Sequence, residues 1–489
     1  MLRIYDTREG KKVDLVLREP GRVGIYVCGV TVYDLCHVGH ARTLVAFDVI
    51  VRHLRARGLE VRLVRNITDV DDKIIRKGHS EDRTAAEVAR SYADAMIADM
   101  AALGIAPPDI EPRATEHIND MIEVIRRLEA RGLAYPAEGD VYYAVAGFAS
   151  YGALSGQSID DLQAGARIEV GEHKRSPLDF ALWKGAKPGE PSWESPWGAG
   201  RPGWHIECSA MAHRYLGDAF DIHGGGSDLI FPHHENEIAQ SEGAYGSFAR
   251  HWMHSGMVNF GGEKMSKSLG NVVTIRRVAE THDLEALRLL LISVHYRSPA
   301  NFTIARDSDG QAVYPDLDEA EARLDYFYRT LERLDTFLAL QAKAQAEAPA
   351  SALGQNAGAA MDDDFNTAAA IGHLYDAFVL ANKLLDDPKA MPKPERARTL
   401  AAITRDARAV GAVLGIMRRS PAEFLLARRD RLCARRKIDA AAVEARIGAR
   451  AAARSAKDFA RADEIRAELK AAGVELMDTP AGTTWRVAG

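Results

Sequence analysis

The fold of the first part of the chain is set by one stretch, Gly21 to Val70, which reads GRVGIYVCGVTVYDLCHVGHARTLVAFDVIVRHLRARGLEVRLVRNITDV. Its first residues, 21–32, predict a short buried strand after a glycine turn. Residues 40–59 carry apolar side chains at helical spacing, and Gly58 ends the helix. Residues 60–70 alternate as a strand. Strand, helix and strand in this order predict a right-handed parallel βαβ unit, so an α/β domain opens the chain.

The same stretch contains two cysteines and two histidines, Cys28, Cys36, His37 and His40. Taken locally, these four side chains could form a zinc site. Alternatively, the turn between strand and helix cradles a phosphate, because a helix N-terminus offers backbone N–H groups to an anion. Gly39 would let the phosphate approach, and the imidazoles could donate hydrogen bonds to its oxygens. The two interpretations predict different proteins.

The composition is that of an ordinary soluble globular protein, with 489 residues, 47% of them hydrophobic and 27% charged. This length predicts two to four domains. No stretch approaches the ~20 apolar residues that span a bilayer, and the N-terminus has no apolar signal core, so we expect a cytoplasmic protein. Four cysteines argue against a disulfide scaffold. The net charge of −6 excludes a chain that is basic throughout, although residues 428–457 hold a surplus of Lys and Arg.

A second motif, KMSKS, runs from Lys264 to Ser268 within a glycine-flanked loop. Lys264 and Lys267 lie three residues apart, and their ammonium groups could neutralise a polyphosphate. A generic K-x-x-K is more often an exposed basic loop. The full string, together with HVGH at residues 37–40, favours a nucleotide site.

These motifs resemble the two signatures of class I aminoacyl-tRNA synthetases. HVGH matches HIGH, with Val38 as a harmless β-branched replacement for isoleucine, and KMSKS matches the second signature. More narrowly, the chain is similar to the cysteinyl-tRNA synthetase family from end to end. The matching stretches are residues 26–43, 64–74, 162–170, 201–211, 220–242, 251–258, 264–271, 361–370 and 482–486.

The resemblance implies an α/β fold, in which a Rossmann-type parallel-sheet catalytic domain with an inserted connective domain precedes an α-helical bundle and a small C-terminal mixed α/β domain. The expected limits are 1–113 and 203–250 for the two catalytic halves, 114–202 for the insertion, 251–303 for the KMSKS loop and stem-contact region, 304–425 for the helical anticodon-binding bundle and 426–489 for the anticodon-recognition domain. Amphipathic patterns between residues 304 and 414 agree with the bundle, and residues 340–360 read as a flexible low-complexity loop. The end of the chain reads as strand, turn and strand.

The resemblance also implies the activity. The expected enzyme is a cysteine–tRNA ligase that uses ATP and Mg²⁺ to convert L-cysteine to cysteinyl-adenylate, and then transfers the cysteinyl group to the 3′ end of tRNA(Cys). His37, His40, Lys264 and Lys267 would be catalytic. ATP would be bound by His37, Gly39, His40, Gly224, Gly225, Asp228 and Lys267. A monomer with no membrane partner is expected.

One zinc ion is implied, because zinc binds the substrate thiol as a thiolate and binds the hydroxyl of serine poorly. Size alone separates such substrates only ~10–200-fold. His233 and Glu237 lie four apart and share a helical face, whereas His234 and Glu235 point elsewhere if the segment is helical. The family pattern places the ligands at Cys28, Cys208, His233 and Glu237. Cys36 and Cys433 are then spectators, with Cys36 packed between strand and helix.

The amino-acid pocket would be lined by Gly29, Thr31, Thr68 and Trp204, with Asp69 or Asp71 for the substrate ammonium group. For tRNA, we expect Trp485 to stack on an anticodon base and Arg486 to contact phosphate. The three aspartates of MDDDFNT, residues 361–367, read as a solvated helix start near the positive end of the helix dipole.

Three alternatives remain. A cysteine ligase acting on an amino-sugar acceptor would use the same adenylate chemistry, but the residues after Ile304 speak against it. A non-catalytic zinc- or nucleic-acid-binding relative should have lost a signature histidine or lysine. A zinc hydrolase is disfavoured because HHENE, residues 233–237, is not H-E-x-x-H.

Overall fold

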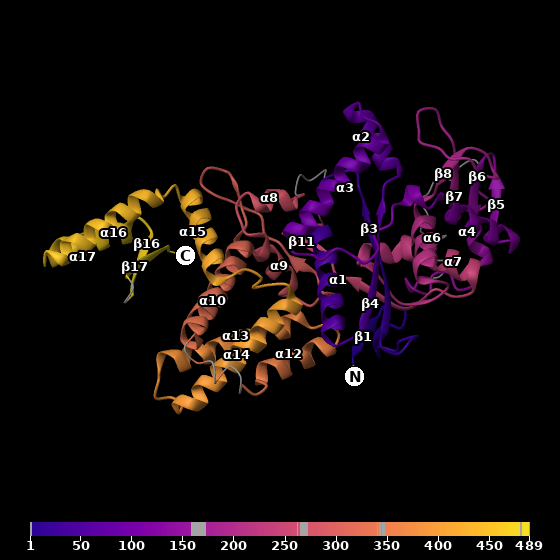
Figure 1. Ribbon diagram of the computed structural model, residues 1–489. Coiled ribbons are helices and arrows are strands. Elements are labelled where there is room, and N and C mark those ends of the chain that lie inside the picture. The colour runs from indigo at the N-terminus through magenta and orange to yellow at the C-terminus, as the bar shows by residue number, and fades with distance from the viewer. Residues whose placement is uncertain are drawn as a thin grey trace.

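The computed structural model describes residues 2–157, 173–261, 263–264, 272–339, 341, 344, 348–479 and 482–488. The described chain is elongated, as Figure 1 shows. An antiparallel sheet lies at one end, a parallel sheet and a helical bundle lie in the middle, and a small C-terminal unit lies at the other end. Among the described residues, none of the helices has the length and apolar character needed to cross a membrane.

The parallel sheet is built on the predicted βαβ unit. Strand β3 (Arg22–Thr31) leads through helix α1 (Val38–Ala56) to β4 (Glu60–Thr68), and the two strands pair in parallel. β9 (Phe220–Gly226) and β10 (Ala249–Ser255) extend the sheet in the order β10-β9-β3-β4. The prediction of an α/β fold with a parallel sheet is therefore confirmed.

Both faces of this sheet are buried, as is usual for parallel sheets. Along β3, Ile25 and Val27 pack into one hydrophobic core together with α1. The alternate residues Tyr26 and Cys28 pack into a second core together with α6 (Trp204–Leu216). The two-residue period of a strand thus separates the side chains of β3 between two layers.

The predicted insertion contains a separate antiparallel sheet. Its strands pair in the order β5-β6-β7-β8, with β5 at Ala134–Ala137, β6 at Asp140–Tyr143, β7 at Phe180–Gly185 and β8 at Gly200–Pro202. The domain limits themselves stay a prediction.

Long helices follow the sheets, as the amphipathic pattern predicts. They are α10 (Pro315–Leu338), α12 (Ala352–Asp362), α13 (Thr367–Asp386) and α14 (Lys393–Leu414). The loop expected at residues 340–360 is contradicted from Ala352 onward, where α12 begins, and residues 340, 342–343 and 345–347 lie outside the described residues. Leu353, Ala357 and Met361 are buried at a four-residue spacing, so this alanine-rich segment has an apolar helical face.

The C-terminal unit packs on the end of α15 (Pro421–Arg436). It consists of α16 (Ala440–Ser455), α17 (Phe459–Ala471) and the antiparallel strands β16 (Val474–Thr479) and β17 (Gly482–Val487). The two predicted strands are confirmed, and the turn between them, residues 480–481, lies outside the described residues.

The prediction of a solvated aspartate run at residues 362–364 is wrong. Asp364 has 0% relative exposure, and it accepts hydrogen bonds from the side chains of Tyr296 and Arg297 and from the backbone of Tyr5. Asp362 contacts His53 at 2.9 Å, and only Asp363 keeps a half-exposed side chain.

The remaining elements are shorter or connect these units. They are β1 (Arg3–Asp6), β2 (Lys11–Asp14), α2 (Asp72–Glu81), α3 (Ala85–Ala102), η1 (Ala114–Glu116), α4 (Ile118–Ala130), η2 (Val145–Gly147), η3 (Ser227–Leu229), η4 (Ile230–His234), α7 (Glu235–Tyr245), β11 (Val258–Phe260), β12 (Glu263–Lys264), α8 (Ile275–Ala279), α9 (Leu284–Ile292), β13 (Ala300–Asn301), β14 (Ala305–Arg306) and β15 (Ala312–Val313).

Candidate active site

A cavity of about 330 Å³ opens at the carboxyl ends of the parallel strands. Its lining comes from the ends of β3, β9 and β10 and from the first turns of α1. The chain passes from β3 to β4 on one side and later returns to β9 on the other, so the cavity lies at a topological switch point of the sheet. Open α/β sheets bind ligands at such points.

A cluster of thiol, imidazole and carboxylate groups lies at one end of this cavity. Ligand atoms of Cys28, Cys208, His233 and Glu237 all lie within 4.8 Å of one another, and all four residues are buried. Glu237 Oε1 is 3.2 Å from Cys28 Sγ and 3.0 Å from His233 Nε2. The pleat of β3 directs Cys28 toward α6, η4 and α7, which carry Cys208, His233 and Glu237 in that order.

The charges in this cluster depend on one another. Burial alone would raise the pKa of the Glu237 carboxyl, but the charges and hydrogen bonds of His223 and His233 outweigh burial and hold this pKa well below its usual value. Burial opposes ionisation of Cys208 too, yet hydrogen bonds from Cys28 and His233 lower its pKa to about 6. Burial raises the pKa of Cys28 well above that of a free thiol. The cluster therefore favours one thiolate and one carboxylate near a histidine.

Sequence reasoning missed two histidines beside this cluster. His223 Nε2 lies 2.8 Å from Glu237 Oε2, and His223, His234, Cys28 and Glu237 form a second possible metal-binding set. His234 was expected to point away if its segment were helical. The segment is irregular at Phe231, however, and His234 Nε2 lies 4.0 Å from Glu237 Oε1. The histidine within the buried strand IHGGG was a signal for His223.

His37 and His40 form a reciprocal cap at the start of α1. Nδ1 of His37 accepts from the backbone N–H of Gly39 and of His40, while His37 N–H donates to Nδ1 of His40. The rings stack with centroids 3.7 Å apart. Two amides expected to meet an anion are therefore used by His37. Because each Nδ1 accepts, the proton of each neutral ring lies on Nε2, which can donate to a ligand.

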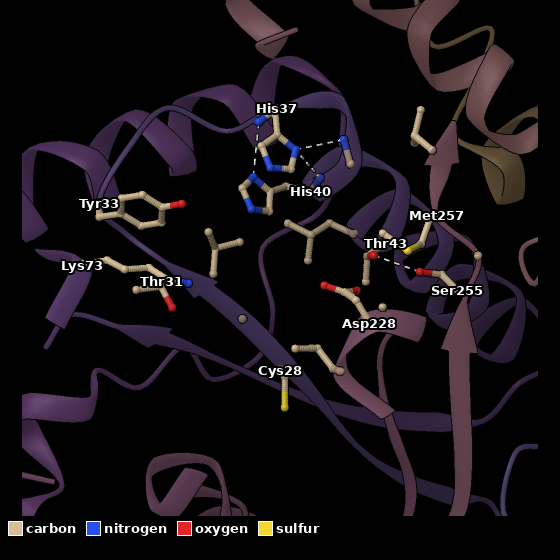
Figure 2. A pocket seen from close by; sticks show the side chains of 18 of the residues that line it. Cys28, Thr31, Tyr33, His37, His40, Thr43, Lys73, Asp228, Ser255 and Met257 are labelled. Carbon is tan, nitrogen blue, oxygen red and sulfur yellow. Dashed lines mark hydrogen bonds between the residues drawn. The ribbon is translucent and has the colours of Figure 1, made fainter. Parts of the chain in front are cut away.

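The two ends of the cavity carry different chemistry, as Figure 2 shows for Cys28 and the histidine pair. Gly29 and Thr31 line it near Cys28. Trp204 lines it as well, and its ring stacks on that of His233 with centroids 4.3 Å apart. Lys73, which the sequence did not single out, lies 5.6 Å from the Tyr33 ring centroid and lines the same cavity.

The cavity is also lined by Asp228 and by Gly226, rather than by the expected Gly224 and Gly225. A Cβ at Gly224 would lie 2.1 Å from the Phe47 ring, so this glycine allows α1 to pack on the sheet. Thr43 and Ser255 also line the cavity, and their hydroxyl oxygens lie 2.8 Å apart.

Comparisons with known proteins match most of the chain. The tRNA synthetases class I (C) catalytic domain model matches residues 15–307, the DALR domain model 358–418, and the cysteinyl-tRNA ligase anticodon binding domain model 439–486. Cysteine–tRNA ligases of Anaeromyxobacter sp. (strain K) and Geobacter sulfurreducens are 55% and 51% identical, over 99% of this chain and 99% of each relative.

The chain belongs to the cysteine–tRNA ligase family. It is therefore a class I aminoacyl-tRNA synthetase. Mycobacterium tuberculosis methionyl-tRNA synthetase, solved with methionyl-adenylate, is 16% identical and superposes with a TM-score of 0.58 over 83% of this chain and 93% of that one, which shows the shared fold. The comparisons do not support the alternative of an amino-sugar ligase.

Several residues expected in the amino-acid pocket of this family member have other partners. Thr68 is buried and donates to Glu207 at 2.8 Å, and it does not line the cavity. Asp69 accepts hydrogen bonds from the backbone and hydroxyl of Thr115. Asp71 caps α2 by accepting from the backbone N–H of Lys73. The carboxylate for the substrate ammonium stays an open prediction.

The second signature of the family falls largely outside the described residues. Lys267 lies there, as does the side chain of Lys264, whose backbone forms β12 with Glu263. β12 pairs with β11, and Val258 of β11 lines the cavity. The chain thus leaves the cavity wall directly toward the lysine signature.

In the family's C-terminal unit, Trp485 does not present a face to an anticodon base. Its exposure is 6%, it packs in a small core with Leu432 and Val443, and its Nε1 donates to Glu444 at 2.6 Å. Its place on β17 turns it toward the helices rather than outward. Arg486 is partly exposed and pairs with Glu475, so its phosphate contact remains a prediction.

Proposed function

We propose that the chain charges tRNA(Cys) with L-cysteine in two steps. In the first, a cysteine carboxylate oxygen attacks the α-phosphorus of ATP, and pyrophosphate leaves. In the second, a ribose hydroxyl of the terminal adenosine attacks the carbonyl carbon of cysteinyl-adenylate, and AMP leaves. The similarity to cysteine–tRNA ligases and the match to an anticodon binding domain support this proposal.

The cluster around Cys28 fits a zinc ion. Tetrahedral ligands with bonds of about 2.0–2.3 Å lie about 3.5 Å from one another. The separations of Glu237 Oε1 from Cys28 Sγ and His233 Nε2, 3.2 and 3.0 Å, approach that spacing. Cys28, Cys208, His233 and Glu237 would hold the ion. When bound, zinc would supply a centre that takes the substrate thiol as thiolate and so discriminates against serine.

The residues at the other end of the cavity act on the phosphates. Nε2–H of His37 and of His40 would donate to phosphate oxygens as negative charge builds on the leaving pyrophosphate. Lys267, with Mg²⁺ carried by ATP, would neutralise the same charge, and Lys264 would support the loop or the phosphates. No side chain needs to act as a covalent nucleophile, because positioning supplies most of the catalysis.

One observation carries the proposal. Cys28 belongs to the thiol and imidazole cluster and also lines the cavity that holds the histidine pair. A thiol-selecting centre and a phosphate-binding pair therefore open on one space, where a small amino acid and a nucleotide can react in line.

The test is ATP–pyrophosphate exchange with cysteine or serine, with zinc measured on the same sample. We expect one zinc per chain and an exchange rate with serine more than ~200-fold lower, beyond what size alone gives. Comparable rates for the two amino acids would contradict the zinc selection. Absence of cysteine-dependent exchange in zinc-loaded protein would overturn the proposed reaction.

A further inference from the structure

Residues 295–298 brace one wall of the cavity. Gly256, Met257 and Val258 line the cavity, and the backbone N–H of Gly256 donates to the carbonyl of Tyr296 at 2.8 Å. A Cβ at Gly256 would lie 2.5 Å from the carbonyl of Ser298, so the two backbones are in close contact. Beyond this point β11 and β13 continue side by side in parallel. The position of residues 295–298 thus fixes the position of the wall.

The same segment is bound to the helix that carries the histidine pair. Arg42 lies two residues after His40 and is 1% exposed. Its Nη2 donates to the carbonyls of His295, Tyr296 and Ser298 at 2.7–2.9 Å, and its Nη1 donates to that of Leu291. Burial lowers the pKa of this guanidinium to about 10. Arg42 therefore holds the segment and the start of α1 in one arrangement.

Asp364 holds the segment from the helical bundle. It lies between α12 and α13, and both carboxylate oxygens are engaged: Oδ1 accepts from the hydroxyl of Tyr296 and from the backbone N–H of Tyr5, and Oδ2 accepts from Nε of Arg297, each at 2.8 Å. The Asp364 backbone donates to the carbonyl of Arg3 at 2.8 Å. A buried carboxylate with three donors fixes the side chains it contacts.

We propose that Asp364 is a positioning residue for the nucleotide end of the site. It does not line the cavity; it acts through Tyr296 and Arg297, which set where residues 255–258 stand relative to the histidine pair. A misplacement of about 1 Å can cost ~10²-fold in rate, so a bond made outside the pocket can control nucleotide binding. The energetic coupling between Asp364 and nucleotide binding is measured by substituting Asp364, not by the chain of contacts itself. This inference rests on the proposed function.

The test compares two neighbouring aspartates in the full chain. Asp364→Asn keeps the shape but offers one acceptor oxygen instead of two, so it cannot serve both Tyr296 and Arg297. Asp363→Asn is the matched control, because Asp363 is 54% exposed and pairs with Lys12 instead of the segment. We expect Asp364→Asn to raise the KM for ATP in cysteine-dependent exchange by about tenfold. The KM for cysteine should stay unchanged, as should both constants of the control.

Tyr296→Phe is a second variant, which removes only the hydroxyl that reaches Asp364 and keeps the buried ring. It should raise the KM for ATP in the same direction by a smaller factor. A purely structural role would lower the melting temperature or the active fraction and leave the KM for ATP unchanged in folded enzyme. That result in both variants overturns the proposal. ATP affinity measured by calorimetry separates this failure from a failure of the proposed reaction, since it needs no turnover.

Discussion

Cys28 lies where the buried cluster meets the cavity. Its thiol lies 3.2 Å from Glu237 in the buried cluster, and its backbone neighbours line the cavity used by the histidine pair. Cys36, eight residues later, is also buried but packs in the hydrophobic core below α1, as the sequence predicts. Burial raises the pKa of Cys36 to about 12. The two buried cysteines of one strand–turn–helix thus differ in their neighbours, because only Cys28 lies among possible metal ligands.

This contrast yields a prediction about zinc. Cys28→Ser should weaken zinc binding by more than ~100-fold and abolish cysteine-dependent exchange, because even residues outside the ligand set change metal affinity 10–100-fold. Zinc content after dialysis and exchange activity are the measurements. Cys36→Ser is the control and should keep both. Full zinc retention by Cys28→Ser would contradict this prediction, because Cys28 belongs to both possible sets of ligands.

For single residues, the sequence predicted which side chains form the buried cluster better than it predicted which residues line the cavity. Cys28, Cys208, His233 and Glu237 meet as the family resemblance implied. Thr68 and Gly224 have packing or hydrogen-bonding partners that no local pattern reveals, because those partners lie far along the chain. Lys73 was missed because a lysine in a helix start has no distinctive spacing.

Among the elements, β17 shows what an alternating pattern can and cannot reveal. The strand was predictable, and Trp485 and Val487 share its buried face. The period of two separates two faces but does not say which face meets the helices. Trp485 was read as exposed because an aromatic beside an arginine suits base stacking. The shared face with Val487 was the signal for burial.

Trp485 and Arg486 can be separated by experiment. Trp485→Ala should destabilise the C-terminal unit by about 3–5 kcal/mol, because it empties a core position. Amide hydrogen exchange in β16 and β17 should accelerate and the KM for tRNA should rise, while cysteine-dependent ATP–pyrophosphate exchange should be unchanged.

Arg486→Ala removes only a surface pair, worth about 0–1 kcal/mol. If Arg486 contacts phosphate, Arg486→Ala should raise the KM for tRNA while the amides of β16 and β17 stay protected from hydrogen exchange. Unchanged protection in Trp485→Ala would contradict the buried placement.

In the whole molecule, the units are joined by pairs distant in sequence. Asp72 of α2 contacts Lys184 of β7 at 2.8 Å and also pairs with Arg201 of β8. Asp364 plays a similar part between the bundle and β1. The order of the units was predictable from the local sequence pattern of each segment. The contacts that join the units were not predictable, because each contact requires two residues that only the folded chain brings together.

The joint at Asp72 should depend on pH. Burial raises the pKa of its carboxyl, but the hydrogen bond and charge of Lys184 and the charge of Arg201 outweigh burial and lower the pKa to about 2. The folded pKa is thus depressed, so the stabilisation is present above the ordinary value near 4 and is lost as the pH falls through about 2. Asp72→Asn should speed amide exchange in β7 and β8 at pH 7. The free energy of local opening should fall by about 1 kcal/mol or less, because the pair is half exposed. The difference should shrink as the pH falls below about 4 and vanish below about 2. A constant difference across pH would contradict this account.

The reciprocal cap of α1 has an entropic consequence. Immobilising a side chain on binding commonly costs about 0.5–1.5 kcal/mol. The imidazoles of His37 and His40 are already held by backbone amides and by each other, so a nucleotide bound as proposed would meet rings whose rotamers were selected when the helix folded. Recognition then needs no reordering of these groups. The same bonds make the histidine pair hard to replace, because a substitution that alters phosphate contact also loosens the first turn of the helix.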